Sequence, residues 1–140
     1  YYDNKKWLKT PLMQSGNVEE KYKAVCGGID EITKKNGYVR NGNIYKVESE
    51  SRETVALFCH FGVECVILSH LLGISPVVLW HNFCALPSSV TTLVTEEREQ
   101  GKAAFRMCGF GDISHLYAGN EEPSFQARFC ETYSNFEERH

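Results

Sequence analysis

The stretch Phe58-Cys59-His60-Phe61-Gly62 contains the residues of this sequence best suited to chemistry. It follows a run of β-prone apolar residues and precedes a segment with helical spacing, so we expect His60 at the carboxyl end of a buried strand. Open α/β sheets bind ligands at that edge. The N–H groups of Phe61, Gly62 and Val63 would begin a helix without intrahelical partners, which favours an anion such as phosphate. The alternative is a buried His60 that hydrogen-bonds a neighbouring carbonyl and has no further role.

Two elements must position this histidine. Residues 54–61 are β-prone and apolar without alternation, which is typical of a strand buried on both faces. Apolar residues from Val63 to Leu71 then recur at helical spacing until Gly73. A buried strand, a tight turn and a helix in direct succession predict an α/β sheet.

A helix is also predicted over Val18–Lys35. Its apolar residues form one stripe, acidic residues occupy its first turn and lysines its last, and Asn36-Gly37 provides a stop. We also expect two β-hairpins and an irregular C-terminal tail. The hairpins comprise residues 37–39 with 44–47 and residues 90–95 with 102–108, residues 77–86 suit no single element, and the last thirty residues predict an irregular tail packed on the domain.

Composition limits the classes of protein that this chain can represent. Its 140 residues suit one domain, and 42% hydrophobic residues argue against intrinsic disorder. A formal net charge of −3 with scattered Lys and Arg argues against nucleic-acid partners and anionic membranes. No apolar run approaches the ~20 residues of a membrane span.

The six cysteines are spread through the chain, mostly in apolar stretches. Disulfide scaffolds crowd their cysteines into short loop-rich chains, so buried thiols are expected instead. No CxxC pair is present to begin a zinc site, and Cys59 and His60, as neighbours on a strand, would point to opposite faces. We therefore expect a reduced, cytoplasmic protein without a metal.

Four stretches, in order and spacing, resemble the C-terminal part of a histidine phosphatase, the superfamily that includes the cofactor-dependent phosphoglycerate mutases. Residues 54–63 resemble the strand and turn with the second active-site histidine, and residues 71–74 resemble the end of the next helix. Residues 87–93 and 111–116 resemble the following strand entry and the Asp-x-x-His-Leu segment. The resemblance implies a phosphoglycerate mutase-like three-layer sandwich with a mainly parallel sheet. Residues 1–140 would be the C-terminal part of that single domain, without its N-terminal strand or strands.

The resemblance also implies a reaction and a site. The family transfers a phosphoryl group through a phosphohistidine intermediate, and His60 matches its second active-site histidine. We expect neither a cofactor nor a metal in this chain. Phe61 and Gly62 would bind the substrate beside it, although Phe61 replaces the glycine that commonly follows this histidine. His81 and Ser89 fall where family members line the mouth of the pocket. The expected ligand is a small phosphomonoester or inorganic phosphate.

The nucleophilic histidine of the family lies in an Arg-His-Gly motif, which this chain does not contain. We therefore expect the nucleophile, the clamping arginines and the acid upstream, and no activity from this chain alone. The missing strand would be supplied by a preceding segment, by another chain or by self-association, because an open edge is avoided in soluble proteins. One alternative is a non-catalytic phosphate-binding or protein-interaction domain of the same fold. Another is an unrelated small α/β domain.

Overall fold

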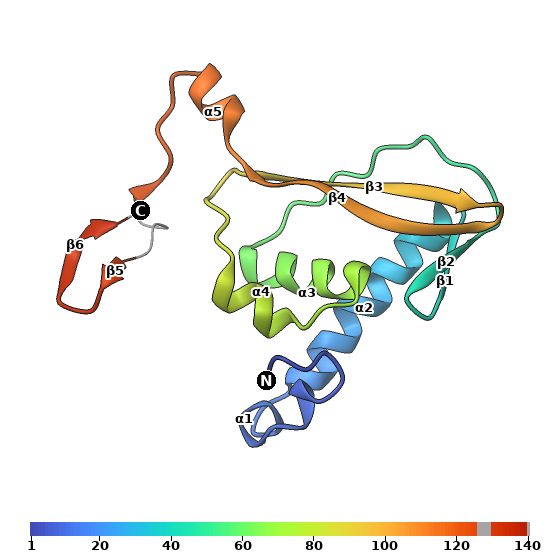
Figure 1. Cartoon of the computed structure of the whole chain (residues 1–140), viewed down its shortest axis with the longest axis horizontal. Coiled ribbons are helices and arrows are strands. Elements are labelled where there is room, and N and C mark those ends of the chain that lie inside the picture. Colours follow the sequence, from blue (N-terminus) through green and yellow to red (C-terminus); the bar gives the residue numbers. More distant parts are fainter. Residues whose placement is uncertain (126–129, 140) are drawn as a thin grey trace. The chain divides into compact units, whose positions relative to one another are not determined.

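The computed structural model describes the backbone of residues 1–125 and 130–139 (Figure 1). Its contacts divide the chain into two compact units. The first contains Tyr1–Phe83 and Val94–Arg106, and the second contains Cys84–Leu93 and Met107–His140. The chain is of the mixed α/β class, with a four-stranded sheet in the order β1-β2-β4-β3 and a separate pair β5-β6.

The helices of the first unit follow the local signals of the sequence. The predicted helix over Val18–Lys35 is confirmed as α2, and it ends at Asn36 before Gly37, whose φ is +89°. The helix predicted after His60 is confirmed as α3, which ends at Gly73 in the left-handed conformation. The sequence did not assign residues 77–86 to an element, and the first part of this stretch belongs to α4. The N-cap of α4, Ser75, accepts a hydrogen bond from the Val77 N–H. The bounds are η1 Trp7–Lys9, α1 Pro11–Gln14, α2 Val18–Lys35, α3 Phe61–Leu72 and α4 Pro76–Asn82.

Both predicted hairpins are present. Strands β1 (Tyr38–Asn41) and β2 (Ile44–Val47) pair antiparallel around a turn with Gly42. Strands β3 (Val90–Glu99) and β4 (Lys102–Asp112) are neighbours in the sheet, and β2 pairs antiparallel with β4.

The prediction of a mainly parallel sheet is wrong, because the four-stranded sheet is antiparallel. Its hairpins have turns of two residues, a connection that only antiparallel strands allow. A parallel pair would need a crossover connection of a dozen or more residues.

The strand predicted over residues 54–61 is also wrong. Residues 50–60 have no regular secondary structure, and α3 begins at Phe61 (Figure 1). Phe58 is 98% exposed, and Val55 and Leu57 are about half exposed. The residues are β-prone, but a strand forms only where a neighbour accepts its backbone hydrogen bonds, and the described chain places no strand beside them.

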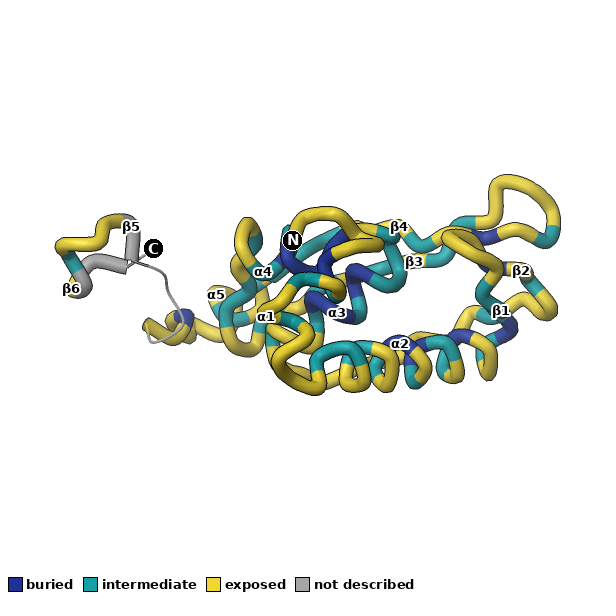
Figure 2. Tube along the Cα trace, turned by 90° about the horizontal axis from the view of Figure 1, so that it is seen from below, coloured by how far each residue is buried: buried dark blue, intermediate teal, exposed yellow. Residues whose placement is uncertain are grey.

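The core of the first unit lies between α2, α3, α4 and the first hairpin, where Figure 2 shows the buried positions. Trp7 is 1% exposed, and its ring packs edge-on against Tyr22 and Trp80 at centroid distances of 5.1 and 5.7 Å. Tyr45 is fully buried and packs edge-on against Phe105 at 5.0 Å. Aromatic pairs of this geometry add to the stabilisation from the buried apolar area.

The second unit contains regular elements where an irregular tail was expected. They are α5 (Ser114–Ala118), β5 (Cys130–Thr132) and β6 (Asn135–Arg139), the last two paired antiparallel. The Asp112 carboxylate accepts hydrogen bonds from the Ser114 N–H at 2.8 Å and the Ser114 hydroxyl at 2.6 Å. These bonds lower the pKa of Asp112 and fix the start of α5. Residues 126–129 and 140 of the expected tail lie outside the described residues.

Candidate functional site

His60 is the N-cap of α3, in an extended backbone conformation. Its carbonyl accepts hydrogen bonds from the N–H groups of Val63 at 2.9 Å and Glu64 at 3.0 Å. The side chain of His60 is exposed, so the buried histidine of the alternative interpretation is not observed. His60 therefore presents its imidazole to solvent at the first turn of a twelve-residue helix.

The backbone beside His60 is open. Within the described chain, the N–H groups of Phe61 and Gly62 have no acceptor, as expected for the first positions of a helix. A Cβ added at Gly62 would meet nothing within 4 Å, so this glycine is not required by packing. Its carbonyl accepts a hydrogen bond from Trp80 Nε1 at 3.1 Å, which ties the start of α3 to α4. The start of α3 therefore offers the two free N–H groups of Phe61 and Gly62, and the hydrogen bond from Trp80 fixes its position against α4.

The other two predicted site residues are placed differently. His81 follows Trp80 on α4 and is exposed, with its ring edge-on to Tyr2 at 6.3 Å. Ser89 belongs to the second unit, where its N–H donates to the Leu86 carbonyl at 3.0 Å in the turn before β3. Among the described residues, no hydrogen bond or ring contact joins His60 to His81. The structure thus places Phe61, Gly62 and, through Trp80, the helix of His81 near His60.

The charges near His60 limit the chemistry of this site. The amino end of α3 carries a partial positive charge, and Glu64 places a carboxylate in its first turn. Desolvation of the sulfur by neighbouring atoms, followed by the Glu64 carboxylate, raises the pKa of the exposed Cys59 thiol. A thiol attacks as its thiolate, so Cys59 is poorly suited to act as a nucleophile at neutral pH. A helix start with free N–H groups favours an anion, and the adjacent Cys59 thiol is not activated.

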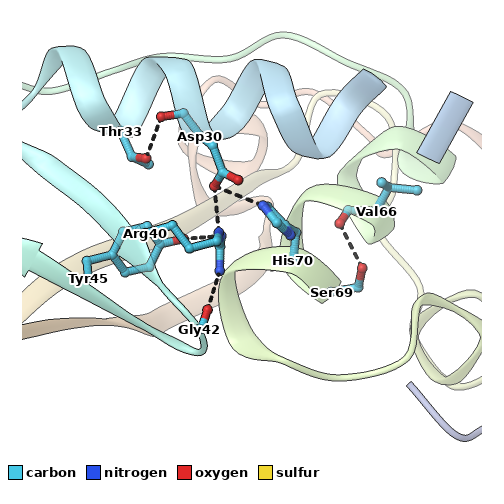
Figure 3. Close-up of polar contacts among 8 residues, drawn as sticks. All are labelled: Asp30, Thr33, Arg40, Gly42, Tyr45, Val66, Ser69 and His70. Atoms are coloured by element: carbon cyan, nitrogen blue, oxygen red, sulfur yellow. Dashed lines mark hydrogen bonds and ion pairs between the residues drawn. The ribbon is translucent and has the colours of Figure 1, made fainter. Parts of the chain in front are cut away.

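The structure contains a polar cluster that the sequence pattern did not predict. It joins Asp30 on α2, Arg40 on β1, Tyr45 on β2 and His70 on α3, and we call it the Asp30 cluster (Figure 3). One carboxylate oxygen of Asp30, Oδ1, accepts a hydrogen bond from Arg40 Nε at 2.6 Å and lies 2.9 Å from His70 Nε2. Arg40 also hydrogen-bonds the Tyr45 hydroxyl and the Gly42 carbonyl. The carboxylate therefore ties two helices to the first hairpin.

Burial governs the protonation of the Asp30 cluster. It lowers the pKa of His70, and the positive charge of Arg40 acts in the same direction, whereas the hydrogen bond to Asp30 opposes both. Burial also raises the pKa of Tyr45 to about 12 and raises the pKa of Cys26 on the same face of α2. At neutral pH these shifts favour a neutral imidazole, phenol and thiol beside the charged Arg40. The cluster has no activated nucleophile and serves to hold the three elements together.

Only a weak signal for this cluster exists in the sequence. Tyr22, Cys26 and Asp30 recur at intervals of four, which places them on one face of the helix. Their partners are Arg40 and His70, which lie 10 and 40 residues beyond Asp30. Nothing local connects residues at such separations.

The cysteines are only partly as predicted. Cys26 and Cys65 are buried, and burial raises the pKa of Cys65 to about 12. Cys59, Cys84 and Cys108 are exposed, which corrects the expectation of buried thiols. Cys26, Cys59, Cys65 and Cys84 are free thiols, and the side chain of Cys130 lies outside the described residues.

The chain matches no family model, no curated protein and no solved structure. Across the described residues, no group of three His, Cys, Asp or Glu side chains is arranged to hold a metal ion. No helix in this part of the chain has the length and apolar character needed to cross a bilayer.

Proposed function

We propose that this chain is the C-terminal part of a histidine phosphatase that hydrolyses a small phosphomonoester, with His60 as its second active-site histidine. The observation that carries the proposal is the exposed imidazole of His60 at the N-cap of α3, beside the free N–H groups of Phe61 and Gly62. Donors of this kind favour a phosphoryl group.

In this proposal each residue at the helix start has one task. His60 donates a hydrogen bond to a phosphoryl oxygen, and the N–H groups of Phe61 and Gly62 stabilise the negative charge that develops during transfer. The phosphorus is attacked by a histidine outside these 140 residues, because the chain has no Arg-His-Gly motif. His81, which follows Trp80 on α4, would contribute to substrate binding, and the chain alone does not hydrolyse phosphate esters.

Binding is tested first, by NMR of the histidine ring protons during titration with inorganic phosphate or vanadate. We expect the His60 resonances to shift with saturation and the His60→Gln variant to lose most of the affinity. His115→Gln is the matched control. His115 is an exposed histidine on α5 in the second unit, and its replacement should leave binding unchanged. Titrations that leave the His60 resonances unmoved would sink the proposed role of this residue.

Catalysis is tested on a longer chain that includes the residues preceding Tyr1 in the same reading frame. We expect an Arg-His-Gly motif there, release of p-nitrophenol from p-nitrophenyl phosphate, and a phosphohistidine that survives alkaline quenching. The His60→Ala variant should lower kcat by about 100-fold or more, as the loss of an oxyanion donor does in other enzymes. An upstream sequence without a nucleophilic histidine would remove the catalytic claim.

The second candidate is a phosphate-binding or protein-interaction domain without catalysis. The absence of Arg-His-Gly from these residues agrees with it. Saturable vanadate binding by the longer chain, without turnover, would favour this candidate.

A further inference from the structure

Residues 54–60 form the most exposed apolar stretch of the first unit, and we call them the 54–60 segment. Phe58 is 98% exposed, Leu57 48% and Val55 47%, and all seven residues belong to the exposed class. The segment contains no charged residue and no proline. Soluble proteins normally cover or charge such a stretch.

The backbone of the segment also lacks partners for its hydrogen-bonding groups. Within the described chain, the N–H and C=O groups of residues 54–59 have no hydrogen-bond partner, and the carbonyl of His60 bonds only to the first turn of α3. Residues with high β-propensity and free backbone groups on both edges are a template for strand pairing. Pairing would satisfy these groups and cover the apolar side chains in one step.

We propose that the 54–60 segment pairs antiparallel with the same segment of a second copy, around a two-fold axis at Leu57. In this register Leu57 faces Leu57 of the other copy, Ala56 faces Phe58, Val55 faces Cys59 and Thr54 faces His60. The register follows from symmetry, since a two-fold axis through a strand pair places each residue opposite its counterpart at the same distance from the centre.

The residue types of the segment fit a second copy. Two identical strands meet without like-charge repulsion because the segment is uncharged. The register places the large ring of Phe58 opposite the small Ala56, and Val55 opposite the small Cys59, so neither face is overfilled. Glu53 and Arg52 fall opposite Phe61 and Gly62, which places no like charges across the pair.

The proposal is independent of the proposed function. A strand has two edges, and antiparallel pairing with a second copy occupies one of them. Phosphate binding at His60 and self-pairing of the segment therefore succeed or fail separately. The phosphate titration tests the first, and the mass of the 140-residue chain in solution tests the second.

Sedimentation velocity over a concentration series is the first test. We expect a monomer–dimer equilibrium that Leu57→Lys shifts at least tenfold towards monomer, because two ammonium groups would face each other at the axis. Leu12→Lys is the matched control: Leu12 is 64% exposed on α1, and the same substitution there should leave the equilibrium unchanged. Circular dichroism checks that both variants keep the helices.

Cysteine cross-linking tests the register. In a background in which Cys59, Cys84, Cys108 and Cys130 are replaced by Ser, Leu57→Cys should form a disulfide-linked dimer under mild oxidation. Opposed residues of an antiparallel pair have Cα atoms about 4.5–5.5 Å apart, within the range for a disulfide. Val55→Cys in the same background is the control, since its two copies would lie four residues apart along the strands, about 13 Å.

Four results would overturn the proposal. One is a chain that stays monomeric at every concentration, and another is a dimer that Leu57→Lys leaves intact. The third is a Leu57→Cys variant that cross-links no faster than Val55→Cys. If the amides of residues 54–60 gain protection only in a chain extended upstream of Tyr1, the occupant is a preceding segment and the second copy is excluded.

Discussion

At the scale of single residues, the contrast between His60 and His70 separates binding from structure. His60 is exposed at the start of a helix with two free backbone donors beside it, so its imidazole is available to a ligand. His70 is partly buried, with 17% of its side chain exposed, and its Nε2 is engaged by Asp30. The same residue type therefore serves a proposed site in one place and the packing of the fold in the other.

His70 should make the stability of the fold depend on pH. Burial and Arg40 lower its pKa in the folded state, so the folded protein resists protonation that the unfolded chain accepts. The unfolded state then binds more protons as the pH falls below the ordinary imidazole value of about 6.5, and the free energy of unfolding decreases towards the lowered folded pKa. Above the ordinary imidazole pKa of about 6.5, the full contribution of His70 to the free energy of unfolding is present.

Urea unfolding between pH 5 and pH 8 measures this effect. The other titratable neighbours Tyr45 and Cys26 have raised pKa values and titrate above this range. His70→Gln, which keeps a polar group near Asp30 but does not titrate, should flatten the profile near pH 6. His115→Gln should leave it unchanged, and a profile that keeps its slope in His70→Gln would assign the effect to another group.

Removing the carboxylate of Asp30 should destabilise the fold. Asp30→Asn leaves the Arg40 guanidinium, whose side chain is 19% exposed, without its charged partner, and we expect a loss of about 1–3 kcal/mol in the free energy of unfolding. Glu19→Gln is the control, because the Glu19–Lys23 pair is exposed on the surface of α2 and should contribute little. Equal losses in both variants would show that Asp30 acts as an ordinary surface charge.

At the scale of elements, α2 shows how local chemistry sets the limits of a helix. Glu19 and Glu20 lie near its amino end, and Lys34 and Lys35 near its carboxyl end, so both ends complement the helix dipole. Gly37 then adopts φ +89°, and a Cβ there would overlap the carbonyl oxygen of Ser49. The glycine is required both by its conformation and by the close approach of the chain.

Two glycine substitutions, one within α2 and one just beyond its carboxyl end, should have opposite effects on stability. Gly37→Ala should lower the free energy of unfolding by about 2 kcal/mol, from the left-handed conformation and the overlap with Ser49. Gly27→Ala should raise it by about 0.5–1 kcal/mol, since Gly27 lies inside α2 and an added Cβ meets nothing within 4 Å. Thermal or urea unfolding measures both, and a loss in each would contradict the argument for Gly27.

At the scale of the whole molecule, burial is distributed unevenly between the two units. Among the described residues, the buried side chains from Trp7 to Ala103 belong to the first unit. Pro123 is the one buried residue among those described in the second. Because burial of apolar area is the main stabilising term of folding, we expect the described elements of the second unit to be less stable than those of the first.

Hydrogen exchange should reveal this difference directly. We expect amides of α2 and α3 to be protected at least tenfold more strongly than those of α5, measured by mass spectrometry of peptic fragments. Residues 54–59 serve as an internal reference for unprotected backbone in dilute solution. Equal protection of α5 and α2 would show that contacts beyond those described stabilise the second unit.

The sequence by itself determined the elements whose signals are local. The helix over Val18–Lys35, its stop at Gly37, the hairpin around Gly42 and the helix that ends at Gly73 all follow from spacing, end charges and glycine, which act within a few residues. His60 was placed correctly before a helix for the same reason. The identity of a ligand at His60 stays a prediction.

Only the tertiary structure decided how distant parts of the chain meet. The 54–60 segment has the composition of a buried strand, yet it is exposed and unpaired because strand formation depends on a neighbour that sequence pattern does not supply. The antiparallel sheet and the contacts of Asp30 with Arg40 and His70 likewise join residues that no local signal connects. Local preferences select each element, whereas pairing, burial and charge contacts between elements depend on the folded chain as a whole.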